Sequence, residues 1–536
     1  MAETLNLGTD GNWATKENSL LGYNSESGNY KPLPFDFTRA SNGTFVNKSG
    51  LIETAANGVP RIDFSDSTSG ALLLEPQRSN LINYSSDYTN PYWTKSGATI
   101  QADATTAGSE LVTNGDFATD TDWTKETGWT ISGGTANSDG TSSSSALYQN
   151  LSLTTGSLYK LSFKVTNYVS GSFKVYLSDG QQIGATDLIT SNGNYTFYIA
   201  ALGALCLFRN VTNFIGSIDN VSVKEVQGFA SPDGTNNAYK LVEDSNNSTH
   251  RVYRPSNIPS GTSTISVYAK KSERNYVVLS NSSDGTTVYY NLSTGVIDAQ
   301  SVGWDYSNID ELGNGWYRCS ATLTVSSSKT LSIYIAETSS SVSYQGDGTS
   351  GLYIYGAQVE QGSYSTSLIN TQGSAVTRVS EFYDNGGNDQ VINSTEGVLY
   401  AEISSFVNTD SYRLISLNNG DSSNNIFFGL RADTGYIYFL IQKDGVTQLS
   451  NVSSISPLNS MTKIALKFKE NDCSCWINGV QIGSTDTSVN LPIGLNRLDM
   501  DFGNGSKSYP FRGNVKDLRV YNTALTDAEL AALTTI

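Results

Sequence analysis

The feature that most constrains this chain is an alternation of apolar and polar residues that recurs along much of its length. In 159–165, Tyr159, Leu161, Phe163 and Val165 share one face of an extended strand, and polar residues occupy the other face. The same period of two recurs at 173–177, 265–269, 331–335 and 464–468. One buried face and one wet face are typical of antiparallel sheets packed as sandwiches. We therefore expect an all-β chain of concatenated antiparallel jelly-roll or β-sandwich modules.

Local signals place the turns and one helix. The pair Asn478-Gly479 between two alternating segments is typical of a type I′ hairpin turn. Thr526 and Glu529 have the spacing of a capping box and predict a short helix near the C-terminal end. At 536 residues the chain is too long for one hydrophobic core, so its length suggests three or four domains.

The charge and the scarcity of histidine narrow the possible functions. A formal net charge of −17 argues against nucleic-acid partners and anionic membranes, because phosphate groups are bound by Lys and Arg. Neutral polymers such as glycans meet no such conflict. His250 is the single histidine, and its sequence context shows no nucleophile or metal-ligand partner. We predict no catalytic residues, and we expect that the protein is not an enzyme.

Cysteine usage and the first residues suggest where the protein is assembled. The four cysteines are Cys206, Cys319, Cys473 and Cys475, and their spacing favours reduced structural thiols. The beginning of the sequence shows no basic stretch followed by an apolar run, so we expect no signal peptide. Both observations favour assembly in a reducing cytoplasm.

The final module is expected at 396–536. It contains a strand at 463–469, the Asn478-Gly479 hairpin, a strand at 515–521 and the tail Tyr521-Asn522-Thr523-Ala524-Leu525-Thr526. This order resembles laminin-G-like, concanavalin-type lectin domains. The resemblance implies two packed antiparallel sheets, with a rim that often binds glycans or proteins.

A second module is expected at 109–227. Its opening Asn114-Gly115-Asp116-Phe117 and its closing 218–223 segment resemble the end strands of carbohydrate-binding-module jelly rolls. The resemblance implies that these strands lie close together and share a structural calcium, with Asp116 and Asp219 as the matching carboxylates. Two carboxylates alone do not define a calcium site, so two solvated strand-end aspartates remain the alternative.

Carbohydrate binding would use aromatic side chains in this second module. Aromatic rings can stack on the apolar faces of sugars, and short amides and carboxylates can satisfy the hydroxyl groups. The candidates are Trp123, Trp129, Tyr148 and Tyr198. Core packing is the alternative for the tryptophans, because tryptophan in sandwiches is more often buried.

The segments that flank this module read as one discontinuous domain, at 80–108 and 228–372. Their motifs include 90–95, Pro232-Asp233-Gly234, 315–318 and 355–362, and in that order they resemble the jelly-roll domain of phage head-spike or fibre proteins. The second module is then an insertion into a surface loop of the first, which adjacent module termini tolerate. Motifs at 37–41, 59–64 and 72–81 resemble phage tail- and head-fibre chains as well. We interpret 1–79 as a virion-docking region and 373–395 as a linker.

The resemblances together predict a bacteriophage virion surface protein, either a head fibre, a capsid decoration or a tail-fibre component. It would dock on capsid or tail proteins through 1–79, associate as a homo-oligomer (a trimer is favoured) and mediate adhesion to host or environmental glycans. One alternative is a purely structural protein that cements a capsid vertex or tail. Another is a polysaccharide depolymerase, which would need two carboxylates facing each other across a cleft.

Overall fold

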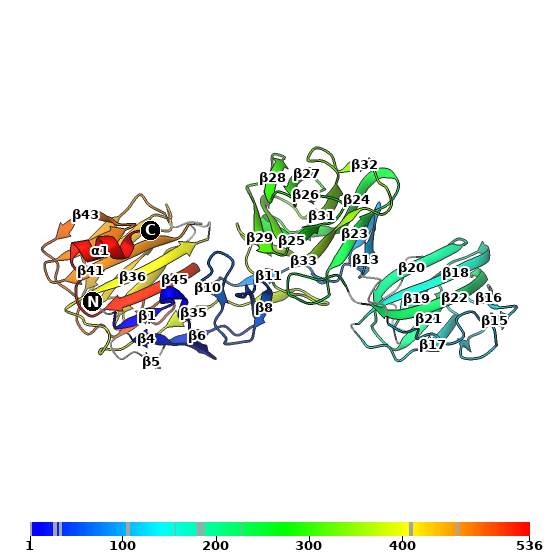
Figure 1. Ribbon diagram of the computed structural model, residues 1–536, viewed down its shortest axis with the longest axis horizontal. Coiled ribbons are helices and arrows are strands. Elements are labelled where there is room, and N and C mark those ends of the chain that lie inside the picture. The colour runs from blue at the N-terminus through cyan, green and yellow to red at the C-terminus, as the bar shows by residue number, and fades with distance from the viewer. Residues whose placement is uncertain are drawn as a thin grey trace.

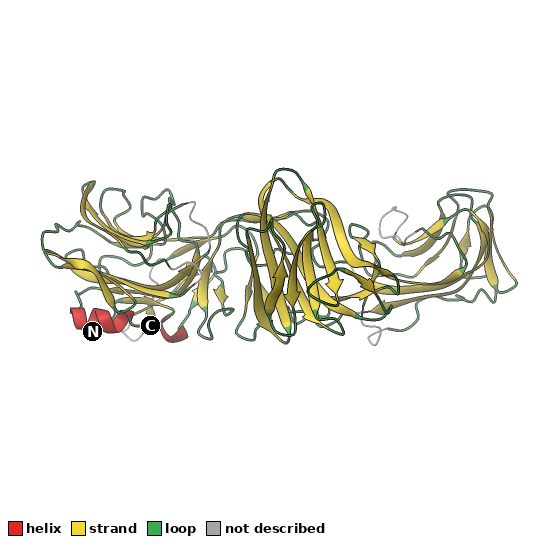
Figure 2. Ribbon diagram, turned by 90° about the horizontal axis from the view of Figure 1, so that it is seen from above, coloured by secondary structure: helices red, strands yellow, loops and turns green. Residues whose placement is uncertain are grey.

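The computed structural model is almost entirely β and confirms the fold class that the alternation predicts. It describes residues 3–24, 29–31, 35–102, 108–155, 157–178, 186, 188–226, 228–406, 411–456 and 460–536. Every pairing between named strands is antiparallel. Three lobes follow one another along the long axis, and both marked chain ends lie in the same end lobe (Figures 1 and 2).

The central lobe is a sandwich built by two separated parts of the chain, and one hydrophobic cluster fills it. Its cluster includes Trp93 before the interruption and Ile265 and Ile333 after it. The first sheet has the order β12 (Thr94–Ser96), β24 (Asn247–Ile258), β31 (Lys329–Ala336), β26 (Tyr276–Asn281), β27 (Thr286–Asn291) and β28 (Val296–Gln300), with β32 (Ser343–Gln345) beside β24. The second has the order β13 (Ala98–Gln101), β23 (Tyr239–Glu243), β33 (Gly351–Gln361), β25 (Gly261–Lys271), β30 (Trp316–Val325) and β29 (Tyr306–Gly313).

The end lobe formed by the intervening chain has its own two sheets and its own core. Phe163 and Phe208 meet in this core at a ring-centroid distance of 5.3 Å. One sheet has the order β14 (Thr124–Lys125), β17 (Ala146–Asn150), β21 (Leu205–Asn210) and β19 (Phe173–Leu177). The other has the order β15 (Trp129–Ser132), β16 (Thr135–Asp139), β22 (Ile215–Val226), β18 (Leu158–Ser170) and β20 (Gly193–Ala200). We call this body the insert lobe.

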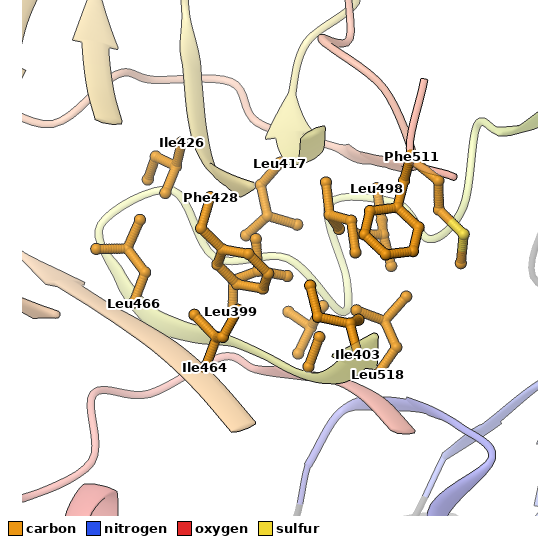
Figure 3. Close-up of a cluster of buried hydrophobic side chains, with 14 of the residues drawn as sticks. Leu399, Ile403, Leu417, Ile426, Phe428, Ile464, Leu466, Leu498, Phe511 and Leu518 are labelled. Carbon is orange, nitrogen blue, oxygen red and sulfur yellow. The ribbon is translucent and has the colours of Figure 1, made fainter. Parts of the chain in front are cut away.

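The opposite end lobe is a sandwich of a five-stranded and a ten-stranded sheet. Leu399 and Ile464 from the larger sheet meet Phe428 and Leu417 from the smaller one in the core (Figure 3). The five-stranded sheet has the order β40 (Val446–Val452), β39 (Ile437–Lys443), β38 (Asn425–Leu430), β37 (Arg413–Asn418) and β44 (Arg497–Asp499). The larger sheet includes β43 (Val480–Asp486), β42 (Cys473–Ile477), β41 (Thr462–Lys469), β36 (Glu396–Ser405) and β45 (Gly513–Tyr521).

Local signals in this C-terminal lobe are confirmed. Asn478 and Gly479 have φ of 48° and 81°, as the two central residues of a type I′ turn require. The helix α1 (Asp527–Thr534) begins at the predicted capping box, in which Thr526 and Glu529 bond reciprocally. No helix in the part of the chain that the structure describes is long and apolar enough to cross a membrane.

The structure differs from the prediction for 1–79, because this region does not form a separate unit. Two of its strands pair with one edge of β45 in the C-terminal lobe, opposite β36: β1 pairs with residues 518–520 and β10 with 513–515. An exposed strand edge can pair with further strands, and β1 and β10 cover part of the edge of β45 in this way. Leu5, Phe37 and Leu72 belong to the same core cluster as the sandwich. The elements are β1 (Leu5–Leu7), η1 (Thr9–Gly11), β4 (Gly22–Asn24), β5 (Asn29–Lys31), β9 (Ile62–Asp63) and β10 (Ala71–Leu74).

The stretch 373–395 is not a linker, because two strands anchor it to the N-terminal region. β34 (Val376–Arg378) pairs with β11 (Arg78–Asn80), and β35 (Phe382–Asp384) pairs with β6 (Asp36–Thr38). Arg378, the last residue of β34, and Glu381, just before β35, are 1% and 0% exposed. The remaining short strands are β2 (Thr15–Lys16) and β3 (Ser19–Leu20), which extend the β6–β35 sheet, and the hairpin of β7 (Gly43–Val46) and β8 (Ile52–Ala55).

A buried ionic cluster joins these segments. The Glu381 carboxylate accepts from Arg39 Nη1 at 2.7 Å and from Arg61 Nε at 2.8 Å. The Glu75 carboxylate pairs with Arg61 at 2.7 Å and with Arg378 at 2.9 Å. All five side chains are at most 2% exposed. The arginines lower the pKa of Glu75 to about 2 against the opposing effect of burial, and they also lower the pKa of Glu381. We call these five residues the ionic clamp.

Candidate functional site

Trp123 and Trp129, predicted to stack on sugars, lie in the core of the insert lobe. They are 6% and 4% exposed. Trp123 packs 5.2 Å from Phe117, and its Nε1 donates to the carbonyl of Asn114 at 3.1 Å. A sugar needs an accessible ring face, so the prediction is wrong for both tryptophans and the core-packing alternative holds.

The two predicted tyrosines lie at different places. Tyr198 on β20 is half-buried and packs against the core cluster of the central lobe, together with Leu158 and Val226 of the insert lobe. It therefore helps to join two lobes instead of facing a ligand. Tyr148 on β17 is half-buried beside Leu207, on the side of its sheet that faces away from the core. Of the four candidates, Tyr148 alone lies where it could contact a ligand, so its binding role stays a prediction.

The predicted calcium residues lie in neighbouring segments, Asp116 in the loop before β14 and Asp219 within β22. The end segments of the insert lobe are adjacent, because Val221 N donates to Gly115 O at 2.8 Å. Asp116 is exposed, and Asp219 accepts from the backbone N–H of Asn220 at 2.7 Å. No group of three or more His, Cys, Asp or Glu side chains among the described residues is placed to hold a metal ion. Calcium takes six to eight oxygen ligands, so two carboxylates do not make the site and its calcium stays a prediction.

His250 is a buried structural residue within β24. It is 0% exposed on β24, and its Nδ1 and Nε2 lie 2.5 Å and 3.2 Å from the carbonyl oxygens of Gly97 and Tyr344. The four cysteines are buried and free. Burial raises the pKa of the Cys475 thiol to about 12. Such thiols are poor nucleophiles.

The open face of the five-stranded sheet carries aromatic residues that the sequence analysis did not select. Five rings form a closed circuit of neighbours, and we call them the aromatic face: Tyr412, Phe427, Tyr438, Phe502 and Tyr509. Successive centroid distances are 5.7 Å (Phe427–Tyr438), 6.4 Å (Tyr438–Tyr412), 5.5 Å (Tyr412–Tyr509), 6.1 Å (Tyr509–Phe502) and 5.7 Å (Phe502–Phe427).

Strand alternation places two of these rings. In β38, Ile426 and Phe428 point into the sandwich core, so Phe427 between them points outward (Figure 3). In β39, Ile437 and Phe439 are core residues, and Tyr438 lies on the outer side. The register aligns Leu414, Gly429 and Tyr438 across three strands. A Cβ at Gly429 would lie 2.0 Å from the carbonyl oxygen of Arg413, so the close approach of the strands requires glycine in this row.

The loop 501–508 and the segment after it bring in Phe502 and Tyr509. Phe502 N donates to Ser508 O at 2.9 Å, and Leu414 N donates to Tyr509 O at 3.1 Å. Gly503 has φ of +75°, and a Cβ there would lie 2.2 Å from Asn418 Nδ2. Only glycine therefore allows the loop to lie this close to the sheet.

A buried polar row anchors the same loop. Asn418 Nδ2 donates to Asp499 at 2.9 Å, and Gly503 N donates to Asp501 at 2.6 Å. Asp501 is 3% exposed. Burial, with a further contribution from Asp499, raises the pKa of Asp501 to about 6 against the hydrogen bond from Gly503. These groups hold the loop and are not accessible to a ligand.

The accessible surface of the aromatic face is amphipathic. Tyr509 is 45% exposed, and Tyr412, Tyr438 and Phe502 are half-buried, whereas Phe427 is 3% exposed and lies beneath the accessible surface. At its edge, Arg431 donates to both carboxylate oxygens of Asp433, at 2.9 Å and 2.6 Å. The hydrogen bonds that Arg431 donates to Asp433 raise the pKa of Arg431, with smaller contributions from Tyr412 and Tyr438. Stacking rings therefore lie next to charged groups that can bond hydroxyl groups.

The opposite outer face of this lobe is covered. The helix α1 lies against the ten-stranded sheet, on the side away from the smaller sheet (Figure 2). Leu530 of the helix packs with Tyr400 and Trp476 in a separate small cluster. The two outer faces thus differ, and the five-stranded sheet presents the aromatic one.

The C-terminal lobe is thus an all-β sandwich with one helix-covered face and one open aromatic face. Residues 388–531, about a quarter of the chain, match the family model of the concanavalin A-like lectin/glucanases superfamily. This agrees with the resemblance noted for 396–536. No curated protein matches the chain in sequence.

Several solved structures are similar over parts of the chain. A Ruminococcus gnavus IT-sialidase CBM40 bound to α2,3-sialyllactose is 18% identical, covering 27% of this chain and 86% of that one, with a TM-score of 0.24. A heptameric SAP-like pentraxin from Limulus polyphemus is 12% identical over 26% and 70%, with a TM-score of 0.22. The CBM22 tandem of Paenibacillus barcinonensis Xyn10C is 12% identical over 49% and 100%, with a TM-score of 0.19. These scores are too low to carry an argument about this chain.

Proposed function

We propose that the C-terminal lobe is a glycan-binding module and that its ligand stacks on the aromatic face. The observation that carries this proposal is the closed circuit of five aromatic rings on the uncovered sheet. The match of 388–531 to a lectin-containing superfamily supports it. Tyr509 and Tyr412 would contact the apolar face of a sugar ring, and Arg431 and Asp433 would bond its hydroxyl groups.

Single sites of this kind bind weakly, since the face is shallow and open. Many copies on one particle raise the effective concentration and so the overall avidity. This fits the wider proposal that the chain is a bacteriophage surface protein, a head fibre, capsid decoration or tail-fibre component that adheres to host or environmental glycans as a homo-oligomer. The support is the resemblance of segments 37–41, 59–64 and 72–81 to phage fibre chains.

A glycan array with the full chain tests the binding proposal. We expect signal on a subset of glycans, and we expect the substitutions Tyr509→Ala and Tyr412→Ala to reduce it strongly. Tyr276→Ala, which removes a half-buried tyrosine of the central lobe that belongs neither to the aromatic face nor to the cleft described below, serves as the matched control and leaves that signal unchanged. An array without signal, or equal signal from Tyr509→Ala and the unmodified chain, would contradict the proposal.

The location on a particle needs a separate experiment. Antibody labelling of purified particles, followed by electron microscopy, would place the protein on the head or the tail. The cementing alternative predicts that most of the lobe surfaces are buried against shell subunits in a particle reconstruction. The depolymerase alternative predicts that the protein releases new reducing ends from capsular polysaccharide. We propose binding without hydrolysis, so we expect no such release.

A further inference from the structure

A cleft with a volume of about 790 Å³ lies outside the aromatic face, where three parts of the chain meet. Its floor is the outer side of the second central sheet. Its walls are the N-terminal hairpin β7–β8 with residues 63–66, and the edge of the C-terminal lobe at 404–406 and 513–514. Small-molecule sites commonly have volumes of about 300–1,000 Å³, so the cleft has room for a ligand of several sugar units.

The floor is a polar ladder that strand register fixes. Tyr306, Thr322 and Thr264 are aligned across β29, β30 and β25. The hydroxyl groups of Thr264 and Thr322 lie 2.7 Å apart. The register likewise aligns Asp310 with Arg318. Hydroxyl groups thus line the bottom of the cleft, and Tyr306, which is 39% exposed, presents a ring at the same level.

Arg318 is held in the floor by its neighbours. Its guanidinium carbon lies 5.4 Å from the centre of the Tyr268 ring, and its Nη2 donates to Ser266 Oγ at 3.2 Å and to the carbonyl of Thr366. Its Nε is buried and has no hydrogen-bond partner among the described residues. A fixed cation with an unsatisfied donor therefore lies beneath the cleft.

Carboxylates face the cleft from both sides. Asp66, on the N-terminal wall, accepts from Asn514 Nδ2 at 3.2 Å, and Asp310, on the floor, accepts from Asn308 Nδ2 at 2.6 Å. Both are exposed to the cleft. Restricted hydration raises the pKa of both groups, and repulsion by Asp63 and Asp310 adds to the effect at Asp66. The cleft therefore concentrates negative potential.

We propose that this cleft binds an uncharged oligosaccharide, with Tyr306 as the stacking ring and with Asp66 and Asp310 accepting hydrogen bonds from sugar hydroxyl groups. The charge decides the class of ligand. Among the described residues of the lining, the acidic residues Asp63, Asp66, Glu75, Asp310 and Glu311 outnumber the one basic residue, Arg318, so acidic sugars are repelled. A divalent cation is not favoured, because the described residues hold no suitable cluster of three ligands.

This site is independent of the aromatic face. It lies in the central lobe and its neighbours, and no residue of the aromatic face belongs to its lining. Loss of binding at one site therefore does not predict loss at the other.

Isothermal titration of the full chain tests the cleft. The probes are the neutral hexasaccharides of the maltose, cellulose, xylan and N-acetylchitin series, with hexagalacturonate as the acidic probe. We expect at least one neutral probe to bind and hexagalacturonate not to bind. Tyr306→Ala should weaken neutral binding roughly tenfold, the upper range for an aromatic contact. Asp310→Asn should also weaken it, while thermal unfolding confirms that both variants fold.

Tyr436→Ala is the matched control, since Tyr436 is also 39% exposed but lies on the C-terminal lobe outside the cleft. It should leave the affinity unchanged. The proposal is overturned if none of the neutral probes binds, if hexagalacturonate binds as tightly as they do, or if Tyr306→Ala and Tyr436→Ala have equal effects. Because Tyr509→Ala removes the aromatic face without touching the cleft, its array result separates failure of this proposal from failure of the other.

Discussion

The ionic clamp offers the sharpest test of how the lobes are held together. The substitution Glu381→Gln keeps the shape of the side chain and removes the charge that Arg39 and Arg61 share. Both arginines are 0% exposed in their side chains and cannot turn to water. Removing one partner of a buried ion pair costs about 3–5 kcal/mol, because a remaining charge stays buried without compensation. Here the charge of Arg39 loses its pairing with Glu381, whereas Arg61 keeps Glu75.

The expected change in melting temperature follows from the size of the unit that unfolds. The N-terminal region and the C-terminal lobe share one core and together make a unit of roughly 240 residues, for which 1 kcal/mol shifts Tm by about 2–4 °C. Glu381→Gln should therefore lower the Tm of this unit by roughly 6–20 °C. Differential scanning calorimetry of the full chain would measure it. The transition of the insert lobe should not move, because that lobe has a core of its own.

A matched control lies in the same lobe. Glu402 pairs with Lys516 at 2.7 Å, in a partly exposed position. Glu402→Gln should change stability by at most about 1 kcal/mol, as is usual for such pairs. If Glu381→Gln lowers Tm no more than this control does, the clamp does not hold the lobe and the reasoning fails.

Three further predictions address other parts of the molecule. The pKa of Asp501 is raised to about 6 in the folded chain, so its ionised form destabilises the fold above that pH. Asp501→Asn should therefore stabilise the C-terminal lobe by about 1–3 kcal/mol at pH 7.5 and not at pH 4. Thermal unfolding at both pH values would measure this difference. The ionised form of Glu75, unlike that of Asp501, stabilises the fold, because its pKa is lowered to about 2 in the folded chain. This contribution is present above roughly pH 4.3 and is lost as the pH falls toward about 2, which calorimetry would measure. Gly503→Ala should strain the loop by about 1–2 kcal/mol and reduce the array signal, since it displaces Phe502 and Tyr509; a normal signal would show that the loop position does not matter.

The sequence predicts local structure well and long-range placement poorly. Alternation and turn residues are local, so the strand at 159–165, the hairpin at Asn478-Gly479 and the helix cap at Thr526 are all found. The pairing of β1 with β45 joins residues more than 500 positions apart, and no local signal announces it. Likewise, the clamp residues resemble ordinary surface charges in the sequence, although the structure buries them completely.

Aromatic residues show the same limit. Trp123 was selected for its type, but burial depends on which face of a strand it occupies and on what packs there. The sequence pattern that would have indicated the aromatic face is an aromatic residue at an outward position of an alternating strand. Phe427 between Ile426 and Phe428, and Tyr438 between Ile437 and Phe439, carry that signal in the sequence. Phe502 and Tyr509 come from a loop whose position depends on Gly503, so alternation could not reveal them.

The folding of the N-terminal region onto the C-terminal lobe constrains any model of attachment to a particle. Residues 37–41, 59–64 and 72–81, the segments that resemble phage fibre chains, contribute Arg39, Arg61 and Glu75 to the clamp. Their sequence pattern thus has a structural explanation within the chain. Docking through 1–79 would place the C-terminal lobe against the particle and leave the insert lobe, at the opposite end, farthest from it (Figure 1). The aromatic face would then lie near the particle surface, whereas docking through the insert lobe would present it outward. A label on the insert lobe of intact particles distinguishes these orientations. If the label is outermost, the chain docks through 1–79, and glycans would have to reach the aromatic face from the side.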